Sequence, residues 1–342
     1  MRSDPRTGDE ALRRATELDP LNSANWIRRG VRAEFAGDPE AAEKLYLEAG
    51  RVSQLFGPRA MLMNFYFRQG DQEQFWKWAR AAFAVSYGNL DGTFLLCWQV
   101  APDAKVILDR AMLKNPATLV QFLDFAVRQA GVTAARPVAD GLVSQADGTS
   151  APALLDYCEE LIRAKRVADA HDIWLGLAHR GLLAGAATGA AQNLIGNAGF
   201  QARPLQRGFG WRTISSPEVT LIPGGKPGEM GIAFSGNQPE EAEVLSQIVA
   251  LPGSTWYRFS AEQRTSQHSD PGLSWEIEDL EAGRCLARLP VVESADWTSL
   301  SARFEASRTP FIRLSLRYQR QPGTVRYEGE VLIRQLRLAG AK

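Results

Sequence analysis

Three histidines are the side chains of this sequence best suited to acid–base catalysis or metal binding. His171 and His179 are eight residues apart on a predicted helix, which separates them by about 12 Å along the axis, too far for one metal ion. His268 lies in the polar segment 265–270, together with serines and an aspartate. A serine–histidine–aspartate triad is assembled from separate elements rather than from one short loop. We therefore expect all three histidines to be structural or solvated.

Two glutamates have the spacing that glycoside hydrolysis requires. Glu276 and Glu278 alternate along a predicted strand, so their carboxylates share one face and lie within about 5–10 Å of each other. Alternating glutamates are also the usual composition of a solvated sheet face. We predict no catalytic residues and no enzymatic activity; a hydrolase or lyase would require two carboxylates that converge in a cleft.

The composition argues against several other classes of function. Lys and Arg (39) balance Asp and Glu (39), whereas a general nucleic-acid-binding protein carries excess positive charge. Cys97, Cys158 and Cys285 are too far apart for a disulfide framework or a metal knuckle, and the GGK segment at 224–226 lacks the spacing of a phosphate-binding loop. No run of 18 apolar residues is present, so no membrane span is expected. We predict neither a cofactor nor a metal ion.

The first half of the chain has the pattern of paired helices. Two Gly-Asp breaks, at 37–38 and 70–71, lie 33 residues apart, close to the 34-residue period of tetratricopeptide repeats. The small and large residues of that family's Trp-x3-Gly…Ala-x3-aromatic-x2-Ala pattern are matched by Trp26, Gly30, Ala42, Tyr46 and Ala49. The chain therefore resembles a tetratricopeptide-like α-solenoid, directly over 10–86 and by continuation of the helical pattern to 185.

Beyond residue 199 the hydrophobic pattern acquires a period of two. Leu273, Trp275 and Ile277 alternate with polar residues, and the segment 312–318 does the same. Pro-Gly turns separate the predicted strands, which are 218–222, 229–235, 243–251, 255–265, 273–278, 283–289, 299–306, 311–319 and 326–338. Nine short strands in this length predict an antiparallel β-sandwich.

Aromatic and glycine motifs follow a specific order in this half. They are FGWR at 209–212, GIAFSG at 231–236, QIVALPG at 247–253, WYR at 256–258, GLSW at 272–275, Trp297 before Phe304, and Glu328-Gly329 before the last strand. This order is similar to the jelly-roll carbohydrate-binding modules of the galactose-binding-like fold. The resemblance implies a multidomain chain, α then β, with a tetratricopeptide-like domain at 1–185, a linker at 186–204 and a carbohydrate-module-like sandwich (jelly roll) at 205–342. Many such modules hold a calcium ion with a carboxylate near the last strand, where this chain has Arg334 and Gln335, so we expect none.

Aromatic and arginine side chains are the predicted contacts to a ligand. An indole stacks on the C–H face of a sugar ring, while planar guanidinium groups hydrogen-bond its hydroxyl or acidic groups. The predicted ligand-binding residues are Trp211, Arg264, Trp297, Arg317, Arg320 and Tyr327, and for each aromatic the alternative is core packing. Trp76 and Trp78 are predicted to contact a protein partner; because they are two residues apart they cannot share one helix face, so one is expected at the surface.

The charges around the predicted strand 311–319 leave two alternatives. Its arginines and those near the following turn are Arg313, Arg317, Arg320 and Arg326. If Glu276 and Glu278 lie on a neighbouring strand, the face is a solvated charge ladder, with cross-strand pairs of about 0.2–1 kcal/mol each. If they do not, the arginines form a cationic patch that suits an acidic glycan. We favour the ladder.

These features predict a non-enzymatic scaffold or binding protein of the bacterial cell envelope, whose repeats dock a protein partner and whose sandwich contacts a glycan. The combination resembles bacterial cell-surface and exopolysaccharide-associated repeat proteins, which implies a role in exopolysaccharide assembly or export. The alternative is a purely structural or self-assembling surface protein that binds no sugar. The half-repeat at 11–20 predicts an N-terminal extension with a membrane anchor or export signal, and hence an envelope, periplasmic or extracellular location; a cytoplasmic location is the alternative.

Overall fold

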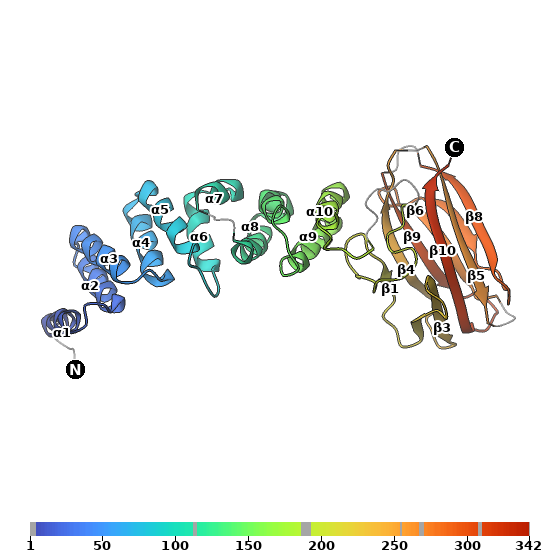
Figure 1. Ribbon diagram of the computed structural model, residues 1–342, viewed down its shortest axis with the longest axis horizontal. Helices are drawn as coiled ribbons and strands as arrows, with labels where there is room; N and C mark the ends of the chain where they lie inside the picture. Colours follow the sequence, from blue (N-terminus) through green and yellow to red (C-terminus); the bar gives the residue numbers. More distant parts are fainter. Residues whose placement is uncertain are drawn as a thin grey trace. The chain divides into compact units, whose positions relative to one another are not determined.

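A computed structural model describes residues 5–111, 115–185, 193–253, 255–266, 270–306 and 310–341 (Figure 1). Within these residues ten helices are followed by ten strands, which confirms the predicted order of an α-helical part and a β-sandwich. The chain divides into two compact units, Met1–Gln145 and Ala146–Lys342. By packing, the last two helices belong to the second unit, whereas the predicted bounds 1–185 and 205–342 follow the change in secondary structure and stay a prediction.

The first unit consists of tetratricopeptide-like helical hairpins. Its helices in the described residues are α1 (Pro5–Leu18), α2 (Ser23–Phe35), α3 (Pro39–Val52), α4 (Phe56–Gln69), α5 (Gln72–Phe83), α6 (Asp91–Val100), α7 (Ala104–Arg110) and α8 (Pro116–Val143). Helix α2 packs on α3, and α4 packs on α5. Gly131, with a φ of 82°, interrupts α8 and divides it into two helical segments. None of the described helices is both long and apolar enough to cross a bilayer.

The two Gly-Asp pairs separate the helices of the hairpins. Gly70 ends α4 in the left-handed region, with a φ of 74°, which glycine adopts at little cost. Asp38 and Asp71 then cap α3 and α5, because each carboxylate accepts a hydrogen bond from a backbone N–H three residues further on. The 33 residues between the two Gly-Asp pairs are therefore the repeat length of the helical hairpins.

Close packing between helices explains the small residues of the repeat pattern. A Cβ atom at Gly30 would lie 2.6 Å from the ring of Tyr46, so only glycine allows this approach of α2 to α3. The Tyr46 hydroxyl donates to Glu34 at 2.9 Å, and the same carboxylate accepts a hydrogen bond from Arg68 of α4 at 2.6 Å. These contacts connect one hairpin to the next.

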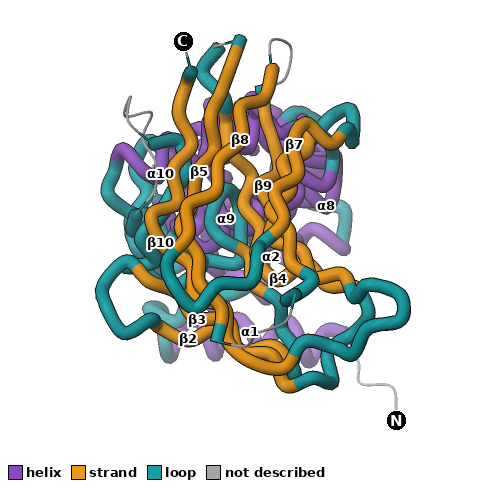
Figure 2. Tube along the Cα trace, turned by 90° about the vertical axis from the view of Figure 1, so that its right-hand side faces the viewer, coloured by secondary structure: helices purple, strands orange, loops and turns teal. Residues whose placement is uncertain are grey.

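The strands of the second unit form two antiparallel five-stranded sheets, drawn in orange in Figure 2. The strands are β1 (Arg212–Thr213), β2 (Val219–Pro223), β3 (Glu229–Ser235), β4 (Glu241–Ala250), β5 (Trp256–Thr265), β6 (Leu273–Asp279), β7 (Cys285–Pro290), β8 (Thr298–Glu305), β9 (Phe311–Gln319) and β10 (Glu328–Gly340). Sheet A has the order β1-β4-β9-β6-β7, and sheet B has the order β2-β3-β10-β5-β8. All nine predicted strands are present, and the two-residue β1 was not predicted.

The hydrophobic core of this unit lies between the two sheets. On β6, Leu273, Trp275 and Ile277 point inward and are buried, while the residues between them are partly exposed. Trp275 packs on Phe259 of β5 with a ring-centroid distance of 5.2 Å, which joins the two sheets. The alternation that predicted these strands therefore also identifies the inner face.

Helices α9 (Ala151–Arg163) and α10 (Val167–His179) are anchored to the segment that leads into β1. Arg212 donates a hydrogen bond to Glu159 of α9 at 2.6 Å, and the backbone N–H of Gly208 donates to the same carboxylate. Gly208 has a φ of 55°, and a Cβ there would lie 2.7 Å from the ring of Trp174 in α10. This hairpin is therefore built onto the sandwich at the β1 side of sheet A, as Figure 1 shows.

Candidate functional site

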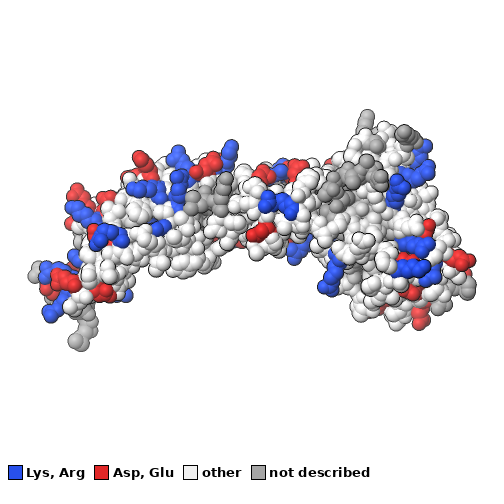
Figure 3. All heavy atoms as spheres, viewed as in Figure 1, with Lys and Arg blue, Asp and Glu red and all other residues white. Residues whose placement is uncertain are grey.

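The outer face of sheet A is a charge ladder, the favoured alternative for the arginines of β9. Strands β6 and β9 are neighbours, with Glu276 opposite Ser315 and Glu278 opposite Arg313. The carboxylate of Glu276 forms ion pairs with Arg288 of β7 at 2.6 Å and with Arg317 of β9 at 3.5 Å. Acidic and basic side chains are likewise interspersed on the part of the sandwich seen in Figure 3. The positive charge of these arginines is thus offset within the chain.

The ladder surrounds a depression, which we call the sheet A hollow. It has a volume of about 410 Å³ and is lined by Glu241, Ala242, Glu243, Glu276, Arg288, Arg317, Tyr318 and Gln319. Glu276 is only 12% exposed, whereas its partners Arg288 and Arg317 are about half exposed. Gln319 donates to Glu241 at 3.3 Å on the side of β4. The hollow therefore presents fixed donors and acceptors around a carboxylate that is itself held in place.

Of the predicted ligand-binding arginines, Arg317 lines the sheet A hollow and Arg320 does not. Arg320 and Arg326 both form ion pairs with Glu240, the residue just before β4. The distance from Arg326 to Glu240 is 2.5 Å. The hydrogen bond from Arg320 and the charges of both guanidiniums lower the pKa of Glu240. These two arginines form a separate cluster around one carboxylate, similar in composition to the cluster around Glu276.

Two of the predicted ligand-binding aromatics are buried. Trp211 is 1% exposed, packs on Phe200 and donates its indole N–H to the carbonyl of Asn197 at 3.2 Å. Tyr327 is also buried and packs edge-on against Phe234. Neither side chain faces solvent, so core packing, the stated alternative, describes both. A rigid aromatic has the same sequence signature on an inner and an outer face, which is why the prediction misplaced them.

Arg264 and Trp297 lie together, beside Arg334. The guanidinium of Arg334 is 3.9 Å from the centre of the Trp297 ring, and that of Arg264 is 5.2 Å from it. Arg334 also forms ion pairs with Glu262 at 2.7 Å and Glu229 at 3.1 Å. The guanidinium of Arg334 therefore occupies ring surface of Trp297 that a stacked sugar would need.

In the first unit, Trp76 is buried and Trp78 is half-buried on α5. Trp76 packs edge-on against Phe75 at 5.0 Å, while Trp78 has Lys77 at 5.7 Å from its ring centre. Trp78 is thus the more accessible of the pair, in line with the expectation that the two occupy different faces. The strongly exposed apolar side chains of this unit lie elsewhere: Leu18, Leu21, Phe35, Leu55 and Tyr87.

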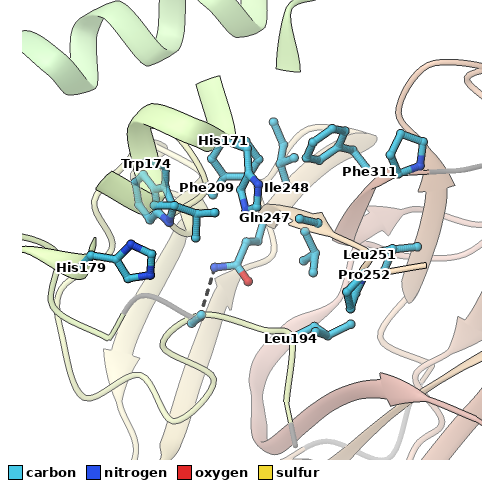
Figure 4. Close-up of a pocket in the computed structure, with 15 residues that line it drawn as sticks. His171, Trp174, His179, Leu194, Phe209, Gln247, Ile248, Leu251, Pro252 and Phe311 are labelled. Carbon is cyan, nitrogen blue, oxygen red and sulfur yellow. Dashed lines mark hydrogen bonds between the residues drawn. The ribbon is translucent and has the colours of Figure 1, made fainter. Parts of the chain in front are cut away.

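A second depression lies between α10 and the edge of β4 and was not predicted from the sequence (Figure 4). We call it the β4 groove. It has a volume of about 470 Å³ and is lined by His171, Trp174, Leu175, His179, Leu194, Gly196, Phe209, Gln247, Ile248, Val249, Ala250, Leu251, Pro252, Pro310 and Phe311. His171 packs against Phe209 and Phe311 with centroid distances of 5.0 and 5.7 Å, and burial lowers its pKa.

No constellation for metal binding was found among the described residues, where no group of three or more His, Cys, Asp or Glu side chains converges. His268 and its immediate neighbours, which the sequence analysis considered for a triad, lie outside the described residues. Glu276 and Glu278 share a strand face, and the two oxygens of Glu276 are engaged by two different arginines. Of the two carboxylates considered for hydrolysis, that of Glu276 is thus held by ion pairs on both oxygens.

Comparisons with known proteins report similarity in structure only. No protein-family model matches the sequence, and no curated protein matches it. Among solved structures, a CBM4 carbohydrate-binding module aligns at 11% identity and a TM-score of 0.35 over 43% of this chain and 99% of its own. TmCBM61, solved with β-1,4-galactotriose, aligns at 18% identity and a TM-score of 0.33 over 44% and 99%. YrrB, described as a TPR protein with an unusual peptide-binding site, aligns at 15% identity and a TM-score of 0.28 over 51% and 100%. Structural neighbours thus include carbohydrate-binding modules for the sheet region and a TPR protein for the helices.

Proposed function

We propose that this chain is a non-enzymatic binding protein of the bacterial cell envelope, in which the sandwich binds a neutral glycan in the sheet A hollow and the helical hairpins dock a protein partner. A role in exopolysaccharide assembly or export is part of this proposal. The observation that carries it is the sheet A hollow, a depression of about 410 Å³ with mostly polar and charged walls.

The hollow matches the hydrogen-bonding needs of a sugar. Sugar hydroxyls both donate and accept, and the hollow offers carboxylate acceptors, guanidinium donors and the amide of Gln319, which does both. Because Arg288 and Arg317 hold Glu276 from two sides, its carboxylate keeps one orientation before a ligand arrives. Groups fixed in advance lose less conformational entropy on binding.

The charges of the hollow favour a neutral ligand over an acidic one. Three carboxylates, of Glu241, Glu243 and Glu276, line it together with two guanidiniums, of Arg288 and Arg317. Such a wall has no surplus positive charge to offset a uronic acid. A polyhydroxyl ligand instead needs donors and acceptors in similar numbers, which these five side chains supply.

The position of the last helical hairpin supports glycan binding over the purely structural alternative. Helix α9 forms ion pairs with Arg207 and Arg212, and helix α10 lines the groove at the edge of β4. They leave Arg288 and Arg317 on the outer face of sheet A about half exposed. If the sandwich served only to pack against this hairpin, an open polar depression that the hairpin does not line would have no role.

A protein partner for the helical unit is supported by its exposed apolar side chains. Phe35, at the end of α2, is 89% exposed, and Leu55 and Tyr87 are also largely exposed. These three side chains are the contacts that we propose for the partner. A photo-crosslinking residue placed at Phe35 is expected to capture a partner from envelope extracts, and the same residue at the buried Trp76 is not.

The glycan proposal is tested by titrating the intact chain with neutral polymers (hydroxyethylcellulose, xylan, β-1,4-galactan) and acidic ones (alginate, polygalacturonate). We expect saturable binding to at least one neutral polymer, with an affinity that changes by less than about threefold between about 50 and 500 mM salt, because screening weakens only charge-driven binding. Binding to acidic polymers alone, lost at high salt, would contradict the choice of a neutral ligand. No binding to any polymer would favour the structural alternative.

A further inference from the structure

No strand among the described residues pairs with the second half of the outer edge of β4. The short strand β1 pairs with Leu245 and Ser246 only, and the chain before it turns away toward α9. Beyond Ser246, strand β4 continues through Ala250 with β9 on one side. On its other side lies the β4 groove, whose far wall is α10.

The register of the sheet shows which backbone groups face the groove. Leu251 donates its N–H to Pro310, so in the antiparallel ladder the residues Val249 and Gln247 also bond to β9. On the other edge, the N–H of Ile214 donates to the carbonyl of Val244, which agrees with this alternation. The N–H and C=O groups of Ile248 and Ala250 therefore point into the groove.

These groups have no hydrogen-bond partner within the described part of the chain. Ile248 is nevertheless almost fully buried. Buried backbone N–H and C=O groups are nearly always hydrogen-bonded. Unpaired groups of this kind at a strand edge, beside a depression, therefore mark a position where a strand of another chain can pair.

A side chain in the groove also has an unused acceptor. Gln247 is 2% exposed and donates its amide N–H to the carbonyl of Gly196 at 3.1 Å. Its amide oxygen is buried and has no partner among the described residues. Figure 4 draws this oxygen on the side of the amide that does not make the hydrogen bond to Gly196. An occupant of the groove must therefore bring an N–H or O–H donor.

Apart from His171 and His179, the remaining side chains of the walls are apolar. Trp174, Leu175, Phe209, Leu251 and Phe311 surround the groove, and none of its lining residues is Asp, Glu, Lys or Arg. A glycan would find few donors and acceptors on these walls, and a charged segment would find no counter-charge. An extended peptide, by contrast, places donors and acceptors at the spacing of a neighbouring strand and turns alternate side chains toward the apolar walls.

We propose that the β4 groove binds an extended, uncharged peptide segment with alternating apolar side chains, which adds to sheet A as an antiparallel strand beside Ile248 and Ala250. The segment pairs with the N–H and C=O groups of these two residues, and one of its donors reaches the amide oxygen of Gln247. This site is separate from the sheet A hollow, so its occupation does not depend on glycan binding.

The test uses the intact chain and a capped, uncharged heptapeptide, acetyl-SVLVLVS-amide, whose serine hydroxyls can donate, together with two versions that carry one N-methyl group on adjacent central residues. In an added strand, only every second N–H faces β4. We expect one N-methylated peptide to bind at least about tenfold more weakly than the parent, and the other to bind within about twofold of it. Equal affinities of all three, or an equal loss for both methylated peptides, would show that the groove takes apolar groups without strand pairing and would overturn the proposal. No binding of the parent peptide at millimolar concentration would overturn it as well.

Two variants of the chain locate the binding. Ala250→Pro removes a single N–H that faces the groove and leaves the ladder to β9 intact, so we expect at least about tenfold weaker peptide binding. Ala250→Ser keeps this donor and is expected to bind as the natural chain does. Leu175→Trp fills the groove from α10 and is expected to abolish binding even when the sheet is unchanged. Unaltered peptide affinity in Ala250→Pro and Leu175→Trp, at an unchanged melting temperature, would place the peptide elsewhere and overturn the assignment.

Discussion

Substitution of Glu159 tests whether the last helical hairpin is a built-in part of the sandwich unit. Its carboxylate accepts hydrogen bonds from the N–H of Gly208 and from Arg212, the latter at 2.6 Å. Glu159 and Arg212 are 28% and 27% exposed, so solvent screens the pair only in part. Glu159→Ala removes both contacts at once and leaves their donors without this acceptor.

The expected loss follows from these two contacts. Hydrogen bonds to a charged group contribute about 1.5–3 kcal/mol each when they are shielded, and partial exposure reduces this value. We therefore expect Glu159→Ala to lower the free energy of unfolding by about 2–3 kcal/mol, which for a unit of this size corresponds to a fall in melting temperature of about 4–12 °C. Glu159→Gln keeps an oxygen acceptor for Gly208 and is expected to lose about half as much.

The neighbouring Glu160 supplies the control. Its partner is Arg163, one turn further along the same helix, and both side chains are exposed. Such a pair contributes about 0.2–0.5 kcal/mol, so Glu160→Ala is expected to leave melting nearly unchanged. Hydrogen exchange adds a local readout, since the segment 205–212 is expected to exchange about 30-fold faster in Glu159→Ala. Equal melting temperatures and equal exchange for the two variants would refute the anchoring of this hairpin by Glu159.

Three further predictions concern packing and titration. Gly30→Ala is expected to destabilise the helical unit by about 1–3 kcal/mol, because the new Cβ would clash with the Tyr46 ring. Gly57→Ala is expected to stabilise α4 by up to about 1 kcal/mol, because no atom lies within 4 Å of the new Cβ. Thermal melting of the two variants checks both expectations. Trp211→Ala is expected to lower the free energy of unfolding by about 3–5 kcal/mol, as measured by chemical denaturation, because the side chain is a buried core aromatic. A decrease below about 1 kcal/mol would show that this side chain is not part of the core. Burial lowers the pKa of His171 below its ordinary value of 6.5, so the unfolded chain binds the proton more tightly. Its contribution to stability is therefore full above pH 6.5 and is lost as the pH falls toward the lower, folded value, and His171→Leu is expected to melt with a weaker pH dependence over this range.

Local patterns predicted most of the fold because each depends on residues close in sequence. The alternation of Leu273, Trp275 and Ile277 with polar residues indicates a strand with one buried face, and in the structure these three residues lie in the core. The Gly-Asp pairs report helix ends because glycine adopts positive φ and aspartate caps the next helix. The charge ladder could also be predicted from the sequence, because it requires only that the strand carrying Glu276 lies next to the strand carrying the arginines.

The candidate sites were harder to predict because they depend on tertiary contacts. The β4 groove needs α10 beside β4 and a β1 strand that ends after two residues, and neither fact has a local sequence signal. Trp211 and Tyr327 were predicted as surface contacts, yet residue type alone does not tell which face of a loop or strand is covered. The partner of Arg334, a pair of carboxylates on β3 and β5, likewise appears only when the strands are in register.

Isothermal titration of a neutral glycan against two double-arginine variants tests the central claim most directly. Arg288 and Arg317 pair with Glu276 in the sheet A hollow, and Arg320 and Arg326 pair with Glu240 outside it. The polymer is the neutral one that binds the natural chain most tightly, and melting temperatures confirm that both variants fold. We expect Arg288→Ala with Arg317→Ala to weaken binding at least about tenfold, and Arg320→Ala with Arg326→Ala to leave it within about twofold. Equal affinities of the two double variants would contradict glycan binding in the hollow.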